Sequence, residues 1–442
     1  MLGMAKKKPL LRKEIEAFVS KLENNPELYE QFRRILDLSD PSEGGKGLDL
    51  NAVEGFLRPE IRATGRAALS EFAKHAENKK AGELKSEDPS VRMREKKLIF
   101  FTVYGAVRVE ERLWRSDSKN YIRPLPQLLG VSHRGYNEQL QRVLTDFGLD
   151  HSFASSVGKL KEHYGFEVPV SSLRSLTLAN AARIAEDAGA DRLDRPNCLP
   201  ESGAAQLVAE ADGSMVPVVR FEGRHKDRRK NRKTEYREAR LAACKPVGQS
   251  QGYYCASMES TEHLGTEWNR LAKQAGRGMN SFVHVVCDGA VWIRKQAEEQ
   301  LRPDRHLLDF FHVCEYLQAA KDGCAGNSRW FGTQKNRLLK NRCDRVIEEL
   351  EGHLEPPGTT EEEAPVRRAH RYLSNRSGEL DYAGARRDGL PIGSGLIESG
   401  HKHVIQARMK IAGAAWKEQT AESMIRTRAK RASGQWDGFW KN

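Results

Sequence analysis

"SFVHVVCDGAVWI", residues 281–293, passes from an apolar run into Asp288 and Gly289. The run has the length and β-branched content of a buried strand, and the residues after it have a helical pattern. Burying a carboxylate is costly unless a partner compensates for it. Asp288 therefore either opens an ordinary turn or forms one wall of a site.

Strands and helices alternate on both sides of this stretch. The sequence predicts a strand that ends at Asp212 and Gly213 and a second short strand that ends near Phe221. Short strands joined by tight turns, followed by strand and helix units, predict a mixed sheet with helices against it. The fold class is α/β. Further strands are predicted at 237–247, 252–259, 281–287 and 306–312, and helices at 261–276 and 290–301.

The region before this sheet is predicted to be mainly helical. Two helical segments between Leu10 and Asp37 are separated by "NNP", and a third helix runs from Asn51 to about Glu77. A polar, breaker-rich segment at 77–90 is expected to be a loop. The predicted domains are a helical region at 1–95, a DNA-binding region at 96–195, a catalytic domain at 204–432 with a helical insertion at about 313–386, and a tail at 433–442.

The DNA-binding region contains two candidate recognition elements. Two β-rich runs around Tyr104 and Gly105 predict a hairpin over 96–114. Two short helices follow at about 151–188, joined at Gly165, with Ser171 as a predicted cap and Leu173, Leu176 and Ile184 facing inward. This length and order match a helix-turn-helix, although an ordinary helical hairpin has the same pattern. Ser172, Arg174 and Ser175 would lie on the exposed start of the second helix.

The overall charge favours a polyanionic partner. Lys and Arg number 73 against 61 Asp and Glu, which gives a net charge of +12. A merely soluble basic protein is the plain alternative. No apolar run approaches the ~18 residues that span a bilayer, and the start "MLGMAKKKPLLRKE" lacks the apolar core of a signal peptide. We expect an intracellular protein with no membrane partner. The seven cysteines include no C-x-x-C pair and favour buried thiols.

Three acids far apart in the sequence are candidates for one site. Asp212 and Asp288 would emerge at one end of the sheet if their strands are neighbours, and Glu398 lies in the opening of a helix. Taken singly, each has an ordinary interpretation as a turn aspartate or a first-turn helix acid. Two charges about 4 Å apart repel by roughly 4 kcal/mol at an effective dielectric near 20, so convergence would require a cation. Carboxylate oxygens suit Mg²⁺ or Mn²⁺, which support in-line displacement at phosphorus.

Four motifs occur in a recognisable order: "ADGS", "VCDGAVWI", "LLDFFHVCEYL" and "GSGLIESGHKHVIQARMKIAGAAW". Over about residues 96–432 the chain resembles the DDE transposases of bacterial insertion sequences, of the kind related to the Mutator superfamily. The resemblance implies an RNase H-like catalytic domain with a helical insertion before the glutamate. It also implies that Asp212, Asp288 and Glu398 are catalytic and bind Mg²⁺ or Mn²⁺, and that Asp309 and His312 form an accessory D-x-x-H element.

Some of these assignments have rivals. Asp309 is the main alternative to Asp288 as second metal ligand, and His312 is as well explained by hydrogen bonding near a strand end. Some related transposases have a cysteine-rich zinc element ahead of the catalytic domain, whereas this chain has no cysteine before Cys198.

Basic residues near the acids are candidate DNA contacts. The segment "RHKDRRKNRK", residues 224–233, has seven Lys or Arg in ten positions and is either a solvated charge run or a phosphate-contacting arm. Trp416 is either a core residue or a stacking platform. The predicted DNA contacts here and near Glu398 are Arg228, Arg229, Lys230, Arg232, Lys233, His401, Lys402, Arg408 and Lys410.

The function that we expect is a DNA transposase that cuts the ends of a mobile element and joins them to target DNA. It would act as a homodimer or higher oligomer on DNA in the cytoplasm, associated with the nucleoid. Two alternatives stay open: an RNase H-like metal-dependent nuclease without strand transfer, and a domesticated DNA-binding protein whose carboxylates are relics.

Overall fold

The structure is a computed structural model. It describes residues 12–440 except 43, 88–91, 116–120, 133–134, 187–198, 224, 325 and 327. Two compact units, Met1–Thr177 and Leu178–Asn442, divide the chain. Each unit is described separately below.

The division falls within α7 (Val170–Glu186), ahead of the predicted domain boundary after residue 195. The last turns of α7 belong to the second unit because α17 (Glu418–Ala432) holds them. Thr427 Oγ1 donates to the carbonyl of Ala181 at 2.9 Å, and Lys430 Nζ donates to that of Ile184 at 2.5 Å.

The first unit begins with α1 (Arg12–Glu23), α2 (Pro26–Ser39) and α3 (Leu50–Glu87). The break between α1 and α2 confirms the "NNP" prediction. The loop predicted from Glu77 is wrong over its first ten or so residues, because α3 continues to Glu87. This segment is rich in Glu, Lys and Ala, which favour a helix, and Gly82 costs only about 1 kcal/mol.

The predicted hairpin is confirmed. β1 (Arg92–Thr102) pairs antiparallel with β2 (Gly105–Arg115) through a turn at Val103 and Tyr104. Gly105 follows this turn at φ 108°, a conformation that L side chains rarely adopt. α4 (Pro124–Leu128), β3 (Val131–Ser132) and β4 (Tyr136–Asn137) complete a sheet of order β2-β1-β4-β3.

The helix-turn-helix candidate is built on a shared core. α6 (Phe153–Tyr164) ends at Gly165, which is left-handed at φ 73° as the stop signal predicts. α7 begins at Val170 directly after Pro169, so Ser171 lies in its first turn and the predicted cap is wrong. Leu160, Leu173 and Leu176 pack with residues of α5 (Glu138–Asp150). Arg174 and Ser175 are exposed and Ser172 is half-buried, so two of the three are available to a ligand.

The second unit contains the predicted mixed sheet. Its strand order is β7-β6-β5-β8-β9, with β5 antiparallel to β6 and parallel to β8. The strands are β5 (Gln206–Phe221), β6 (Arg232–Pro246), β7 (Tyr253–Ser257), β8 (Phe282–Cys287) and β9 (Arg305–Leu308).

One prediction about this sheet is wrong. β5 does not stop at Asp212 and Gly213 but continues unbroken to Phe221. The reason is its pairing with β6, which runs from Leu207 opposite Pro246 to Phe221 opposite Arg232. β8 pairs with β5 only as far as Glu210, so the outer halves of β5 and β6 extend beyond the rest of the sheet as a two-stranded arm.

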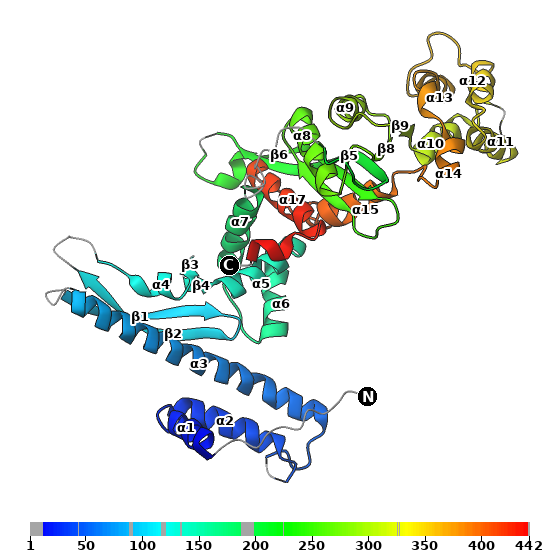
Figure 1. Cartoon of the computed structure of the whole chain (residues 1–442). Coiled ribbons are helices and arrows are strands. Elements are labelled where there is room, and N and C mark those ends of the chain that lie inside the picture. Colours follow the sequence, from blue (N-terminus) through cyan, green and yellow to red (C-terminus); the bar gives the residue numbers. More distant parts are fainter. Residues whose placement is uncertain are drawn as a thin grey trace. The chain divides into compact units, whose positions relative to one another are not determined.

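Helices cover both faces of the sheet (Figure 1). α8 (Thr261–Gln274) and α9 (Val291–Gln296) pack on the face that contains Leu207, Ala209 and Val285. On the other face, α15 (Gly395–Gly400) lies so close to β6 and β7 that a Cβ on Gly400 would meet Leu241 and Tyr254 at 2.8 Å. This close approach fixes which side of α15 faces inward.

The predicted insertion between Asp288 and Glu398 is helical and has its own core (Figure 1, yellow to orange). Its loop ends at Ala364, so the last four residues of the predicted loop "LEPPGTTEEEAPVRR" are helical. The helices are α10 (Phe310–Ala320), α11 (Ser328–Leu339), α12 (Cys343–Glu351), α13 (Pro365–Ser374) and α14 (Tyr382–Arg387).

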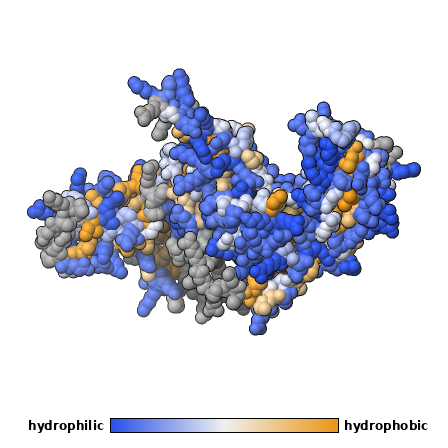
Figure 2. Space-filling view, turned by 90° about the horizontal axis from the view of Figure 1, so that it is seen from above, coloured by the Kyte–Doolittle hydropathy of each residue, from blue (hydrophilic) through white to orange (hydrophobic). Residues whose placement is uncertain are grey.

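Figure 2 shows a largely hydrophilic surface with small apolar areas. Among the residues that the structure describes, no helix has the length and apolarity needed to cross a bilayer. The six cysteines in this part of the chain are free thiols, four of them buried, as expected from their spacing. Cys198 lies outside the described residues.

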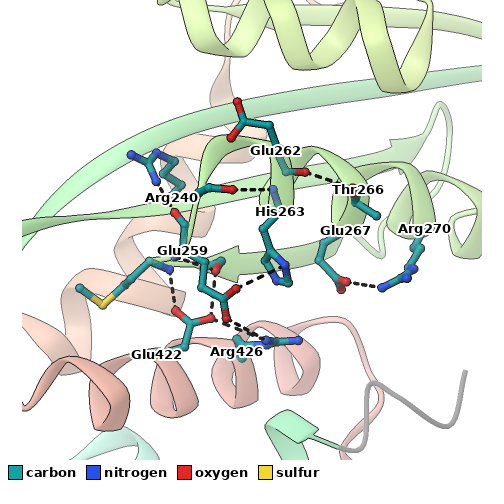
Figure 3. A network of polar contacts seen from close by, with 12 residues as sticks. Arg240, Glu259, Glu262, His263, Thr266, Glu267, Arg270, Glu422 and Arg426 are labelled. Carbon is teal, nitrogen blue, oxygen red and sulfur yellow. Dashed lines mark hydrogen bonds and ion pairs between the residues drawn. The ribbon is translucent and has the colours of Figure 1, made fainter. Parts of the chain in front are cut away.

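A polar network fixes α17 to the edge of the sheet (Figure 3). The Glu422 carboxylate accepts hydrogen bonds from Ser257 Oγ at 2.9 Å and from the Met258 amide at 2.5 Å. Arg426, one turn later, lies 3.7 Å from Glu422 and 4.0 Å from Glu259. Burial raises the pKa of Glu422, and these donors compensate for its charge.

The core under α8 gives a stability prediction. Trp268 is fully buried, and its indole N–H donates to the carbonyl of Ala243 at 3.3 Å. Trp268→Ala should lower the free energy of unfolding by about 3–5 kcal/mol, because it leaves a cavity and an unpaired carbonyl. Urea unfolding followed by circular dichroism measures this. Val291→Ala, at a site 78% exposed, should change it by less than about 0.5 kcal/mol.

Candidate functional site

The parallel pairing of β5 with β8 brings two of the predicted acids together. The ladder pairs Gln206 with Phe282 and continues to Glu210 with Val286. Continued two residues beyond this ladder, the same register leads to Asp212 on β5 and to Asp288 in the turn after β8. Neighbouring strands lie about 4.8 Å apart, and the charge of Asp288 acts on Asp212, so the two carboxylates lie near each other. The hypothesis that Asp212 and Asp288 share one end of the sheet is confirmed, although β5 continues past that point.

Asp288 occupies the turn that follows β8. Its Oδ1 accepts a hydrogen bond from the Ala290 amide at 2.9 Å, which is the ordinary geometry of a turn aspartate. The insertion holds the same turn from outside. The Tyr372 hydroxyl donates to the Asp288 carbonyl at 2.5 Å, and Arg376 donates to that of Gly289 at 2.7 Å. The turn interpretation of Asp288 is therefore confirmed, and its role as one wall of a site stays a prediction.

The environment of Asp212 disfavours its charge. Burial is the largest cause that raises its pKa, to about 6, and the nearby negative charge of Asp288 adds to it. The Gly213 amide donates to Asp212 Oδ1 at 2.6 Å and opposes the shift, as does His312. A cation between the two carboxylates would relieve this repulsion.

His401 lies against Asp212 instead of facing solvent. Its Nε2 is 3.3 Å from Asp212 Oδ2, its side chain is buried, and burial lowers its pKa to about 4. The prediction that His401 contacts DNA from the exposed side of Glu398 is therefore wrong. The physical reason is the close approach of α15 at Gly400, which turns Ile397, Gly400 and His401 toward the sheet. Helix periodicity could not show which side packs inward.

Glu398 is exposed on α15 and does not join the other two acids in a closed cluster. Among the described residues, no three His, Cys, Asp or Glu side chains lie close enough to hold a metal ion together. Asp212 and Asp288 are the pair that could hold one. Glu398 lies near enough to Glu210 that its charge contributes to raising the pKa of that buried acid.

Glu210 is the site residue that the sequence analysis missed. It is buried two residues before Asp212, and its Oε2 accepts from the Ile397 amide at 2.7 Å. Burial raises the pKa of Glu210 to about 8. This contact joins the strand of the first acid to the helix of the third. The available signal was the spacing in "EAD", since residues i and i+2 of a strand share a face.

Asp309 has a structural role. Its carboxylate is fully buried and accepts hydrogen bonds from the amides of Phe311 at 2.6 Å, His312 at 3.0 Å and Ser394 at 2.6 Å, and from the Ser394 hydroxyl. It caps α10 and holds the segment ahead of α15. This bonding leaves Asp288 as the better candidate for second metal ligand. His312 is half-exposed, with Nδ1 3.3 Å from Glu315.

The predicted DNA contacts fall into two groups. Arg408 is buried with its guanidinium 4.5 Å from the ring centre of Trp416, so that prediction is wrong, and Trp416 is a core residue. Arg408 can lie over the Trp416 ring because the backbone of Trp416 pairs with β5. The sequence does not reveal this pairing. The exposed candidates are Lys230, Arg232, Lys233, Lys402 and Lys410. Lys233 pairs with Glu222 at 2.6 Å, and the side chains of Arg228 and Arg229 lie outside the described part of the chain.

A family model matches residues 45–439. The chain belongs to the uncharacterised protein family UPF0236. No curated protein matches its sequence. The matched range includes α3, both candidate recognition elements and almost all of the second unit, so the acid pair lies within what the family model describes.

Glu210 generates a pH-dependent prediction. The folded protein holds this proton more tightly than the unfolded chain, whose Glu pKa is near 4.5. Stability should therefore fall as pH rises from about 4.5 through about 8. Glu210→Gln removes the free-energy cost of a buried negative charge. It should therefore raise the free energy of unfolding by on the order of 3 kcal/mol above this pH range and change it little below the range.

Urea unfolding across this pH range measures the effect. Glu315→Gln is the matched control, because its side chain is 76% exposed, and it should stay within about 0.5 kcal/mol throughout. A Glu210→Gln difference that does not vary with pH would contradict the prediction.

Proposed function

We propose that this chain is a DNA transposase that cleaves the ends of a mobile element and joins them to target DNA. The proposal rests on one observation above all, the proximity of Asp212 on β5 to Asp288 just after the adjacent parallel strand β8. The strand order, with one antiparallel strand among five, and the helical insertion ahead of Glu398 support the RNase H-like catalytic domain that the resemblance implies.

The donor set fits a divalent cation. Asp212 and Asp288 offer hard carboxylate oxygens, and burial together with the charge of Asp288 raises the pKa of Asp212, so a cation between them would stabilise the charged pair. Mg²⁺ or Mn²⁺ at this position would supply activation of an attacking oxygen and stabilisation of the leaving one. Asp212 and Asp288 would hold it, and Glu398, on a flexible exposed side chain, would complete the site.

The surrounding residues have distinct tasks in this proposal. His401 packs against Asp212 as a neutral imidazole, since burial disfavours its protonated form. Glu210 and Asp309 hold α15, and with it Glu398, against the strand end. Glu398 would help to position or deprotonate the nucleophile, first a water molecule and then the freed 3′ hydroxyl.

The partners follow from the same proposal. DNA would approach along the exposed basic residues Lys402 and Lys410 and the β5–β6 arm. Arg174 and Ser175 of α7 are the exposed candidates for recognising the terminal repeats. Acting on two element ends implies a homodimer or higher oligomer on DNA, and the chemistry implies a cytoplasmic, nucleoid-associated location.

Substitution of the acids tests the chemistry. Asp212→Asn and Asp288→Asn should each reduce Mg²⁺-dependent cleavage of element-end DNA by at least ~100-fold, because each removes a direct ligand. Asp322→Asn, whose side chain is 90% exposed, is the control and should cleave as the wild type does.

Product analysis separates the rival functions. Joined products on element-end DNA support the transposase, whereas cleavage without joining supports a nuclease on the same fold. DNA binding that continues with no metal-dependent cleavage in the wild type would identify a DNA-binding protein with relic carboxylates.

A further inference from the structure

The β5–β6 arm, defined as residues 213–221 and 232–240, has one covered face. Val216 and Val218 are fully buried on that face. Beside them, the backbone of Trp416 pairs with the arm: its carbonyl accepts from the Val219 amide at 2.7 Å, and its amide donates to Pro217 at 3.3 Å. The C-terminal segment therefore pairs with the edge of β5 and holds the arm in place.

Ion pairs strengthen the same attachment. Glu418, at the start of α17, lies 3.3 Å from Arg220 on one strand of the arm and 2.8 Å from Arg237 on the other. A support that binds both strands restrains the arm, and a restrained surface loses little entropy when it binds a partner.

The opposite face of the arm is uncovered and apolar in part. Because paired residues share a face, the pairs of Met215 with Glu238, Pro217 with Tyr236 and Phe221 with Arg232 place three large side chains together. Met215 is 49% exposed, Phe221 50% and Tyr236 66%. Arg232 and Thr234 lie exposed between and beside them. Aromatic rings alternating with basic and hydroxyl groups are typical of surfaces that bind nucleic acid strands.

Charge at the tip of the arm indicates which partner fits this face. Residues 224–233 contain seven Lys or Arg and one Asp. Within the described part of the chain, no carboxylate forms an ion pair with Lys226, Lys230 or Arg232. A tip with a net positive charge beside exposed aromatic rings suits a polyanion that has flat apolar groups.

We propose that the uncovered face of the arm is a DNA-binding surface on which unstacked bases lie against Tyr236 and Phe221, while the tip contacts phosphates. This inference rests on the proposed function in assigning DNA as the partner. The two rings are about 13 Å apart along the arm at 3.3 Å per residue, so they contact different bases. The surface would hold the strand ends that cleavage produces.

Binding measurements on the full chain test the inference without any chemistry. Fluorescence anisotropy in EDTA compares a blunt duplex with the same duplex extended by a single-stranded 3′ end. Tyr236→Ala should weaken binding of the extended DNA by about 5-fold or more, the range for loss of one base–aromatic stack, and should change blunt-duplex binding much less. Tyr236→Phe keeps the ring and should bind as the wild type does.

A matched control and a folding control complete the experiment. Tyr29→Ala removes a tyrosine that is 47% exposed in the first unit and should leave both affinities unchanged. Circular dichroism and thermal melting should show that Tyr236→Ala is folded. The inference would be overturned if Tyr236→Ala bound the extended DNA as tightly as the wild type does, or if it lost affinity equally for both DNAs. It would also be overturned if Tyr236→Phe bound as weakly as Tyr236→Ala.

The outcomes separate this inference from the proposed function. Without divalent metal no cleavage is measured, so a selective Tyr236→Ala effect supports the arm even if Asp212→Asn has no effect on catalysis. The converse result is a wild type that cleaves and joins DNA in a metal-dependent way and a Tyr236→Ala variant that binds the extended DNA normally. That result would support the transposase function and contradict DNA binding by the arm.

Discussion

The parallel backbone ladder between β5 and β8 is the constraint on which the rest of the second unit depends. Five consecutive residue pairs fix the register, and this register alone brings together two acids 76 positions apart in the chain. A shift of one residue would turn Asp212 to the opposite face, because strand side chains alternate. The buried core on both sides of the sheet makes such a shift costly.

Buried carboxylates form a second layer behind the acid pair. Glu210 and Asp309 are both buried, and each accepts backbone hydrogen bonds that offset part of its desolvation, although burial still raises the pKa of Glu210 to about 8. The Ser394 amide donates to Asp309 and the Ile397 amide donates to Glu210. The two acids therefore hold the start of the helix that contains Glu398. Removing either acceptor would leave buried amide groups without partners, which costs more than an ordinary hydrogen bond contributes.

The same C-terminal region serves the sheet in two places. Trp416 pairs with the edge of β5 in the β5–β6 arm, and Glu418 binds Arg220 and Arg237 on the buried face of the arm. In addition, α17 is fixed to β7 through Glu422. Residues more than 150 positions apart in the chain therefore determine which face of the arm remains open. The aromatic and basic side chains on that face are exposed because the C-terminal region packs elsewhere on the arm. The local sequence of the arm does not encode this exposure.

The sequence by itself determined the local structure and the identity of the acid pair. Helix starts and stops such as Gly165, the hairpin at Gly105 and the apolar run before Asp288 depend on neighbouring residues, so patterns of a few positions were sufficient. The tertiary structure decided the continuation of β5 past Asp212, the inward position of His401 and Arg408, and the task of Glu210. These depend on pairing with β6, the approach of α15 at Gly400 and the seating of Trp416, which are contacts between distant segments that no local pattern encodes.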